Sequence, residues 1–273
     1  HHANHCHLLD NIIEPPRHRI EETSVHMNVV SQSLKAHLRA TLHTVSPVWL
    51  AKLRYFNQWR SWPNLSHPQL FDEKLLWLML FWHDALKERC ADKYAMRSYV
   101  EEHGLGHMLP PLLGVYESSA AVDFDALPDK FVLKCTHGSG WNIICQSKSM
   151  LDRTKARRQL DEWMKQDFSK LAGEVHYARI KPLIIAEAFL DDGTGRWPTD
   201  YKLYCFHGYV HCTLVCTGRD TGRYTVDFYD REWRNQLPYR KSSLLMDRSI
   251  PKPPGYEDMI VAAESLCGPF PFV

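Results

Sequence analysis

The sequence predicts an α+β protein in which a helical region precedes strands that alternate with helices. Apolar residues in the first third recur at spacings of three and four, which is typical of helices, whereas the later apolar runs are short and end at turn residues, which is typical of strands. Two pairs of these runs are hairpin-like, and this order favours α+β layers over a doubly wound parallel sheet. The glycine motifs GxGxxG and GxxxxGK(S/T) do not open any predicted helix.

The N-terminal part of the chain is predicted to be basic and helical. Leucines recur at helical spacing over 33–53, and Ser46-Pro47 is typical of a helix cap followed by proline in the first turn. The segment 54–68 is an aromatic connector interrupted by prolines. A basic helix beside tryptophans is compatible with contact to a membrane surface, but we favour a packing helix with a solvated outer face.

Four further helices are predicted. Those over 72–87 and 92–103 follow the connector, and Gly104 is the expected C-cap of the second. The segment 152–168 carries charge pairs four residues apart, and 255–266 follows a proline-rich stretch. The longest apolar run, LLWLMLFW, is far shorter than the roughly 20 residues that span a bilayer.

Strands are predicted in the central region and after it. FVLKC (131–135) and NIICQ (142–146) flank a short glycine loop, and KPLIIAEAFL (181–190) is an apolar strand that ends in a turn. DYKLYCFHGYVHCTLVC (200–216) is a predicted hairpin around His207-Gly208. A short strand is also expected after the loop HMLPP.

Composition and charge exclude several classes of protein. The 273 residues include 33 Lys and Arg against 32 Asp and Glu, so the net charge of +1 offers no global attraction to nucleic acid, and anion recognition must be local. The eight cysteines form no CxxC pair, which favours a reduced, cytoplasmic chain, and Cys205, Cys212 and Cys216 are predicted to be buried thiols. No signal peptide is recognisable.

Both ends of the sequence are unusual. The chain starts HHANHCHLLD, where four histidines and Cys6 crowd the first seven residues and could bind a metal ion. We favour instead a tag remnant or upstream translated sequence, with Met27 as the natural start. The other end, GPFPFV, stops on an apolar run and is expected to be a strand that has been cut short.

The loop THGSG after the first central strand carries the first chemical signal. Its glycines allow the backbone to approach an anion closely, and successive N–H groups in such a turn form an anion-binding concavity. Lys134 at the strand end would add a mobile charge with three donors. The structural alternative is a hairpin turn with a lysine on its polar face, and these residues alone do not decide between the two.

Two further acidic positions are compatible with a nucleotide site. Glu187 lies near the end of an apolar strand, where a carboxylate can accept from an adenine amino group, and the structural alternative is an ion-paired glutamate. Asp200 and Lys202 are two apart in a strand and so share a face, which suits ribose hydroxyls and phosphate. An ordinary ion pair would also explain Asp200 and Lys202.

Seven motifs in order resemble the TupA-like branch of the ATP-grasp family, which is found in polysaccharide and capsule gene neighbourhoods. They run from about Val48 to the last residue: LFDEKLLWL, CADKYAMRSYV, LPDKFVLKCTHGSG, IIAEAFL, DYKLYCFHG, DFYDREW and AAESLCGPFPFV. Each motif alone is weak, whereas all seven in the family's order and spacing are specific.

The resemblance implies a two-lobed ATP-grasp fold that binds ATP between its lobes. Lys93 and Lys134 would contact the phosphates, and a loop would close over them to exclude water: His137, Gly138, Ser139 and Gly140. Trp141 would pack the base of this loop. The adenine hinge would consist of Glu187, Ala188, Phe189 and Leu190. Asp200 would hold the ribose, while Lys202 and Arg219 would reach phosphate or substrate as catalytic cations.

The resemblance also implies a reaction and a domain organisation. The expected function is an ATP-dependent ligase that joins a carboxylate to an amine through an acyl phosphate, in the biosynthesis or modification of a cell-surface polysaccharide. The expected partners are ATP and a carboxylate-bearing glycan or small molecule, with no nucleic acid, and contact of the N-terminal basic helix with a membrane surface stays open as an alternative. The expected divisions are a non-native or disordered leader, a helical region, a first lobe and an incomplete second lobe, at 1–26, 27–90, 91–186 and 187–273.

Magnesium is the expected cofactor beside ATP, but no residue of the chain is assigned as its ligand. In the family the ligands lie on the strand that follows a stretch like PFPFV and on its hairpin partner, beyond Val273. Asp227, Asp230 and Glu232 of DFYDREW precede those strands, so a solvated turn is expected there. The sequence is therefore expected to be a fragment of a longer product, with a degenerate family member as the alternative.

Two other functions stay open at this point. A glycosyltransferase or phosphotransferase could use the same scaffold, because a fold indicates a nucleotide site more safely than it indicates a reaction. A non-catalytic module that binds a nucleotide or a partner is the other alternative, and it is motivated by the missing metal strands.

Overall fold

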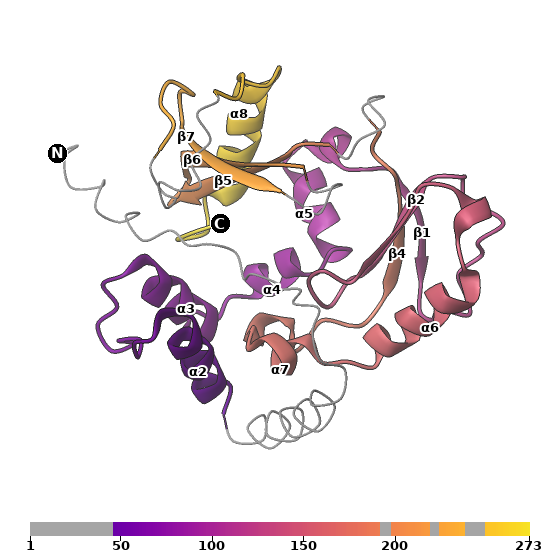
Figure 1. Cartoon of the computed structure of the whole chain (residues 1–273), viewed down its shortest axis with the longest axis horizontal. Coiled ribbons are helices and arrows are strands. Elements are labelled where there is room, and N and C mark those ends of the chain that lie inside the picture. Colours follow the sequence, from indigo (N-terminus) through magenta and orange to yellow (C-terminus); the bar gives the residue numbers. More distant parts are fainter. Residues whose placement is uncertain (1–45, 192–197, 219–223, 238–248) are drawn as a thin grey trace, which may run out of the picture. The chain divides into compact units, whose positions relative to one another are not determined.

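The computed structural model describes four stretches of the chain (Figure 1): residues 46–191, 198–218, 224–237 and 249–273. They belong to two compact units. The first unit consists of residues up to Asp84 together with Asp167–Arg179, and the second consists of Ala85–Gln166 together with Ile180–Val273. Helices and antiparallel strands occur together in the second unit, in agreement with the predicted α+β class.

The first unit is built from helices whose starts have clear local causes. α2 (Pro47–Trp59) begins as predicted, because the Ser46 hydroxyl accepts a hydrogen bond from the Val48 N–H at 3.2 Å and Pro47 occupies the first turn. The short helices α7 (Phe168–Ala172) and η4 (Val175–Tyr177) complete this unit. None of the helices in the described stretches is both long and apolar enough to cross a membrane.

The start of α3 (Phe71–Phe81) depends on a buried carboxylate. Glu73 is 6% exposed and accepts hydrogen bonds from the backbone N–H groups of Asn64, Gln69 and Leu70. Burial acts to raise the pKa of Glu73, but these backbone bonds outweigh it and hold the pKa below its usual value. The carboxylate therefore fixes the entry of the chain into α3.

The prediction of one continuous helix over 72–87 is wrong. α3 ends at Phe81, and a separate helix, α4 (Ala85–Ala91), follows. The residue before α4 is Asp84, a type that favours helix caps over helix interiors. The helix predicted over 92–103 is α5 (Ala95–Glu102), and it is followed as expected by Gly104 with φ of 74°.

The larger sheet of the second unit has four antiparallel strands in the order β1-β4-β2-β3: β1 (Leu112–Tyr116), β2 (Phe131–Cys135), β3 (Asn142–Cys145) and β4 (Ile184–Ala188). Phe131, Leu133 and Cys135 of β2 are fully buried, and α6 (Arg153–Met164) packs against this strand. Val132 and Lys134 lie on the other face and are only half-buried. The strand thus separates an apolar face from one that can carry a polar site.

The smaller sheet contains the predicted hairpin. β5 (Asp200–Phe206) and β6 (Tyr209–Thr217) are joined at His207 and Gly208, whose φ angles of 48° and 80° suit a tight two-residue turn. β7 (Thr225–Asp230) then pairs with β6. The solvated turn expected in this last segment is wrong for Asp227, which lies in β7 and is 1% exposed, because alternating branched and aromatic residues favour a strand.

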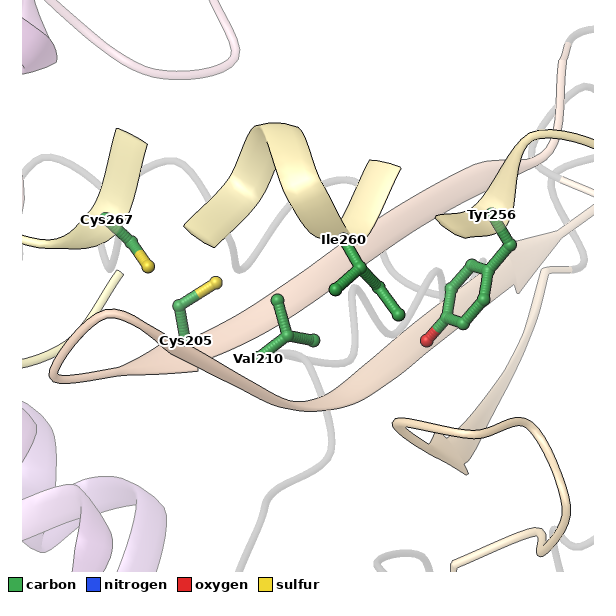
Figure 2. Packing of buried hydrophobic residues seen from close by; sticks show 5 residues of the cluster. All are labelled: Cys205, Val210, Tyr256, Ile260 and Cys267. Carbon is green, nitrogen blue, oxygen red and sulfur yellow. The ribbon is translucent and has the colours of Figure 1, made fainter. Parts of the chain in front are cut away.

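A hydrophobic cluster attaches α8 (Tyr256–Cys267) to the smaller sheet. Figure 2 shows Cys205 and Val210 of the hairpin facing Tyr256, Ile260 and Cys267 of the helix, and all five are buried. The Tyr256 hydroxyl also shares a buried hydrogen bond of 2.7 Å with the Thr213 hydroxyl.

The cysteines of the smaller sheet are buried, in agreement with the sequence prediction. Cys205, Cys212 and Cys216 are buried free thiols, as expected. Past α8, the closing residues run along β5 opposite β6: the Val273 and Cys205 backbones exchange hydrogen bonds of 2.8 and 3.0 Å, and Phe272 pairs with Phe206. GPFPFV therefore ends in strand-like pairing.

Candidate functional site

A buried carboxylate with two cationic partners lies on the polar face of the larger sheet. Glu187 is 5% exposed, and its Oε1 accepts from Arg97 Nη1 at 2.9 Å while its Oε2 accepts from Lys134 Nζ at 2.5 Å. In the register of β2 and β4, Glu187 pairs with Val132, so Lys134 two residues further lies on the same face. Ion pairing with both cations makes the burial of this carboxylate tolerable.

Arg97 was not identified as a functional residue from the sequence. It lies on α5, is 8% exposed, and donates through Nη2 to the Pro110 carbonyl at 2.8 Å as well as to Glu187. The available signal was its place four residues after Lys93 in the helix expected over 92–103, although in the structure Lys93 lies in the turn before α5.

Lys93 connects the start of α5 to the glycine loop. Its Nζ donates to the Cys135 carbonyl at 3.1 Å and to the Gly138 carbonyl. Asp92 fixes the backbone beside it by accepting from the Tyr94 N–H at 2.8 Å. Burial lowers the pKa of Lys93, and the nearby charge of Lys134 lowers it further, so the two predicted phosphate-binding lysines are close enough to repel each other.

The glycine loop is firmly attached to the sheet. Thr136 lies at its start, and its hydroxyl donates to the Lys181 carbonyl and accepts from the Leu183 N–H, each at 3.1 Å. Ser139 and Gly140 are exposed at the tip, and Gly140 has φ of 74° with no atom within 4 Å of the place that a Cβ would take. The tip therefore has open space beside it, as an anion-binding loop requires.

His137 occupies a different position from the one expected of a residue that closes over a ligand. Its ring is 3% exposed, its Nε2 contacts the Trp163 carbonyl at 3.1 Å, and it packs edge-on against Trp141 at 5.0 Å. Trp141 in turn stacks parallel to Trp163 at 6.5 Å, so it packs the base of the loop as expected. Burial lowers the pKa of His137, which favours a neutral ring.

The expected adenine hinge begins at the same carboxylate. The Ala188 N–H bonds to the Pro111 carbonyl at 2.9 Å, Ala188 and Phe189 are half-buried, and Leu190 is 56% exposed. The ion-paired glutamate that was the structural alternative for Glu187 is present in the structure. A role of these residues toward adenine stays a prediction.

The remaining predicted residues lie on the smaller sheet or outside the described stretches. Asp200 and Lys202 share a face of β5 as predicted, with 3.8 Å between Asp200 Oδ2 and Lys202 Nζ, so the alternative of an ordinary ion pair is also realised. Both side chains are substantially exposed. Arg219 lies outside the residues that the structure describes.

The described residues contain no preformed cluster of metal-binding side chains. Within the four described stretches, no group of three or more His, Cys, Asp or Glu side chains is arranged to hold a metal ion. Asp227 is buried and its Oδ1 accepts from Gln236 Nε2 at 2.9 Å, while Asp230 accepts from the backbone of the turn that follows. The histidines near the N-terminus fall outside the described residues.

Comparison with known proteins identifies the family. The model of the family described as TupA-like ATPgrasp matches residues 73–273, which include every site residue discussed above. The chain belongs to the TupA-like ATP-grasp family. No curated protein and no solved structure matches the chain. Membership of the TupA-like ATP-grasp family indicates an ATP-dependent enzyme with ligase-type chemistry, and enzymes of the ATP-grasp type generally use ATP and Mg²⁺.

Proposed function

We propose that the protein is an ATP-dependent carboxylate–amine ligase that works through an acyl phosphate. The observation that carries this proposal is the cluster of Lys93, Arg97 and Lys134 around Glu187, beside a glycine loop with an exposed tip. Three cations against Glu187 and the nearby Asp92 leave one net positive charge in a half-buried site, and such a site attracts a polyphosphate.

In the proposed complex the nucleotide lies along this face of the sheet. Lys134 turns from Glu187 toward the phosphates. Lys93 stays bonded to the Gly138 carbonyl, and the N–H of its ammonium group that is still unused donates to the phosphates. Arg97 stays bound to Glu187 and balances its charge. The adenine would lie at Glu187 to Leu190 and the ribose at Asp200, between lobes formed by 91–186 and 187–273.

The proposed reaction has two steps. The substrate carboxylate attacks the γ-phosphorus of ATP, which gives an acyl phosphate and ADP, and the amine then attacks the acyl carbon and releases inorganic phosphate. The described residues contribute positioning and neutralisation of charge on the transferring group. Magnesium, which the family generally uses, would neutralise further charge on the phosphates.

The proposed substrate is a carboxylate-bearing glycan or glycan precursor of the cell surface, with an amino acid or amino sugar as the amine. The sequence resemblance to a family found in polysaccharide gene neighbourhoods supports this choice. The test is to incubate the protein with ATP, magnesium and a panel of uronic acids and amines, and to measure the release of ADP and phosphate. Release of neither product over the whole panel would count against a ligase.

Mass spectrometry of the product separates the ligase from a phosphotransferase. An amide product has the summed mass of the two substrates less one water, whereas a phosphotransferase adds a phosphate to one substrate. Titration calorimetry with ATP, with and without magnesium, addresses the binding step separately. Binding of ATP without turnover on any substrate would favour a nucleotide-binding module.

A further inference from the structure

The outer face of α2 carries a cluster of aromatic side chains. Trp49 and Trp62 are each 53% exposed. Phe56 stacks on Trp62 with ring centroids 4.8 Å apart, and Trp49 meets the edge of Trp62 at 6.3 Å. We call Trp49, Phe56 and Trp62 the aromatic patch.

The aromatic patch is not the side by which α2 packs within its unit. Leu50, Ala51 and Tyr55 form the buried side of the helix, whereas Trp49 and Phe56, two turns apart, lie on the opposite side. Two tryptophans that are half-exposed and in contact with each other form an apolar surface of a kind that soluble proteins usually use for an interaction. The packing helix expected from the sequence therefore also has a second, apolar face.

The stretch of sequence that carries the aromatic patch contains cations and no acidic residue. Lys52 places its Nζ 5.6 Å from the ring centroid of Trp49, and Arg60 is the C-cap of the helix, two residues before Trp62. Arg54 points elsewhere, since its guanidinium donates to the Leu171 carbonyl. The sequence from 46 to 70 contains these three cations and no Asp or Glu.

We propose that the aromatic patch, together with Lys52 and Arg60, docks the protein on an anionic phospholipid membrane. Tryptophan is the side chain best suited to the headgroup region, because its ring is apolar and its N–H can bond to water or phosphate. Lysine and arginine beside it are attracted by anionic headgroups, and their stems lie along apolar surface. The residues of this surface are not those of the proposed nucleotide site, and the proposal does not depend on the proposed reaction.

The test is flotation of the full chain with vesicles of phosphatidylcholine alone or mixed with phosphatidylglycerol. The protein should float with the mixed vesicles and much less with phosphatidylcholine, and added salt should weaken the binding. The fluorescence of exposed tryptophans should shift to shorter wavelength on the mixed vesicles.

Substitutions test whether the aromatic patch and Lys52 are responsible for binding to the vesicles. Lys52→Gln should lower the partition coefficient about fivefold, as expected for one cation near an anionic surface. Trp49→Ala with Trp62→Ala should lower it by roughly tenfold or more, since each ring loses buried apolar area. Lys155→Gln on the exposed side of α6 is the matched charge control and should leave the partition unchanged.

Three results would overturn the proposal. The first is equal flotation with both kinds of vesicle, and the second is an equal loss of binding in the Lys52→Gln and Lys155→Gln variants. The third is binding of an acidic polysaccharide, measured by titration, that the tryptophan substitutions abolish while vesicle binding persists. That result would assign the aromatic patch to stacking on sugars. Lys52→Gln keeps the test valid if the tryptophan variants fail to fold, because Lys52 is not a buried residue.

Discussion

Replacing Arg97 by methionine should destabilise the second unit far more than the loss of an exposed ion pair. Arg97 and Glu187 are 8% and 5% exposed, so Arg97→Met leaves a buried carboxylate with Lys134 as its remaining cation partner among the described contacts, and it removes the donor of the Pro110 carbonyl. Breaking a buried pair from one side costs about 3–5 kcal/mol, and we expect ~3 kcal/mol because Lys134 still compensates in part.

The assay is thermal unfolding followed by near-ultraviolet circular dichroism. For a unit of this size ~3 kcal/mol corresponds to a decrease of about 6–12 °C in the melting temperature. Lys181→Met is the matched control, because Lys181 pairs with Glu117 at 2.6 Å and both side chains are largely exposed. The control should melt like the unsubstituted protein.

A second substitution tests the cause. In the double variant Arg97→Met with Glu187→Gln, no unpaired negative charge remains buried, so part of the lost stability should return. The buried-charge explanation is refuted if the double variant loses as much stability as the two single variants lose together. It is also refuted if Arg97→Met has the same melting temperature as the Lys181→Met control.

Three other substitutions have expected outcomes. Lys134→Met should weaken ATP binding in titration calorimetry and should lower the melting temperature less than Arg97→Met does, because the Lys134 side chain is 30% exposed and Arg97 still pairs with Glu187, whereas Lys130→Met, in an exposed pair with Asp191, should change neither. Burial holds the pKa of His137 below its usual 6.5. The stability that the neutral ring supports is therefore present above pH 6.5 and lost as the pH falls below it. In melting curves recorded across this range, the melting temperature of His137→Gln should depend less on pH than that of the unsubstituted protein. Burial, with Glu73 nearby, raises the pKa of Asp72 from 3.8 to about 7. The free energy of unfolding should therefore fall as the pH rises between these values, and Asp72→Asn should raise the melting temperature above pH 7. Equal melting temperatures of the two proteins above pH 7 would contradict this explanation.

Much of the secondary structure could be predicted because its signals are local. Ser46 and Pro47 start α2, His207 and Gly208 close the hairpin of β5 and β6, and Gly104 follows α5, each through the conformational preference of the residue itself. The break between α3 and α4 was missed because the apolar run extends past the end of α3 to Trp82, and β7 was missed because its acidic residues suggested a turn.

The candidate site could be predicted only in part, since it depends on pairings between distant segments. Lys93, Lys134 and Glu187 were identified, and the structure brings Lys134 and Glu187 into contact. Arg97 was missed because a sequence does not reveal which acid a helical arginine faces across 90 residues. The burial of His137 was missed because the ring depends on Trp163 of α6, which the loop sequence does not contain.

The bond between Lys134 and Glu187 has a consequence for selectivity among anions. A ligand that draws the ammonium group away must compensate for the bond to the internal carboxylate it displaces, and the 2.5 Å contact makes that carboxylate a strong competitor. Sulfate or a nucleoside monophosphate should compete poorly, while a triphosphate, with charge spread over several oxygens in a row, can engage Lys93 at the same time. The ion pair of Lys134 and Glu187 would thus keep weakly charged metabolites from binding at this site.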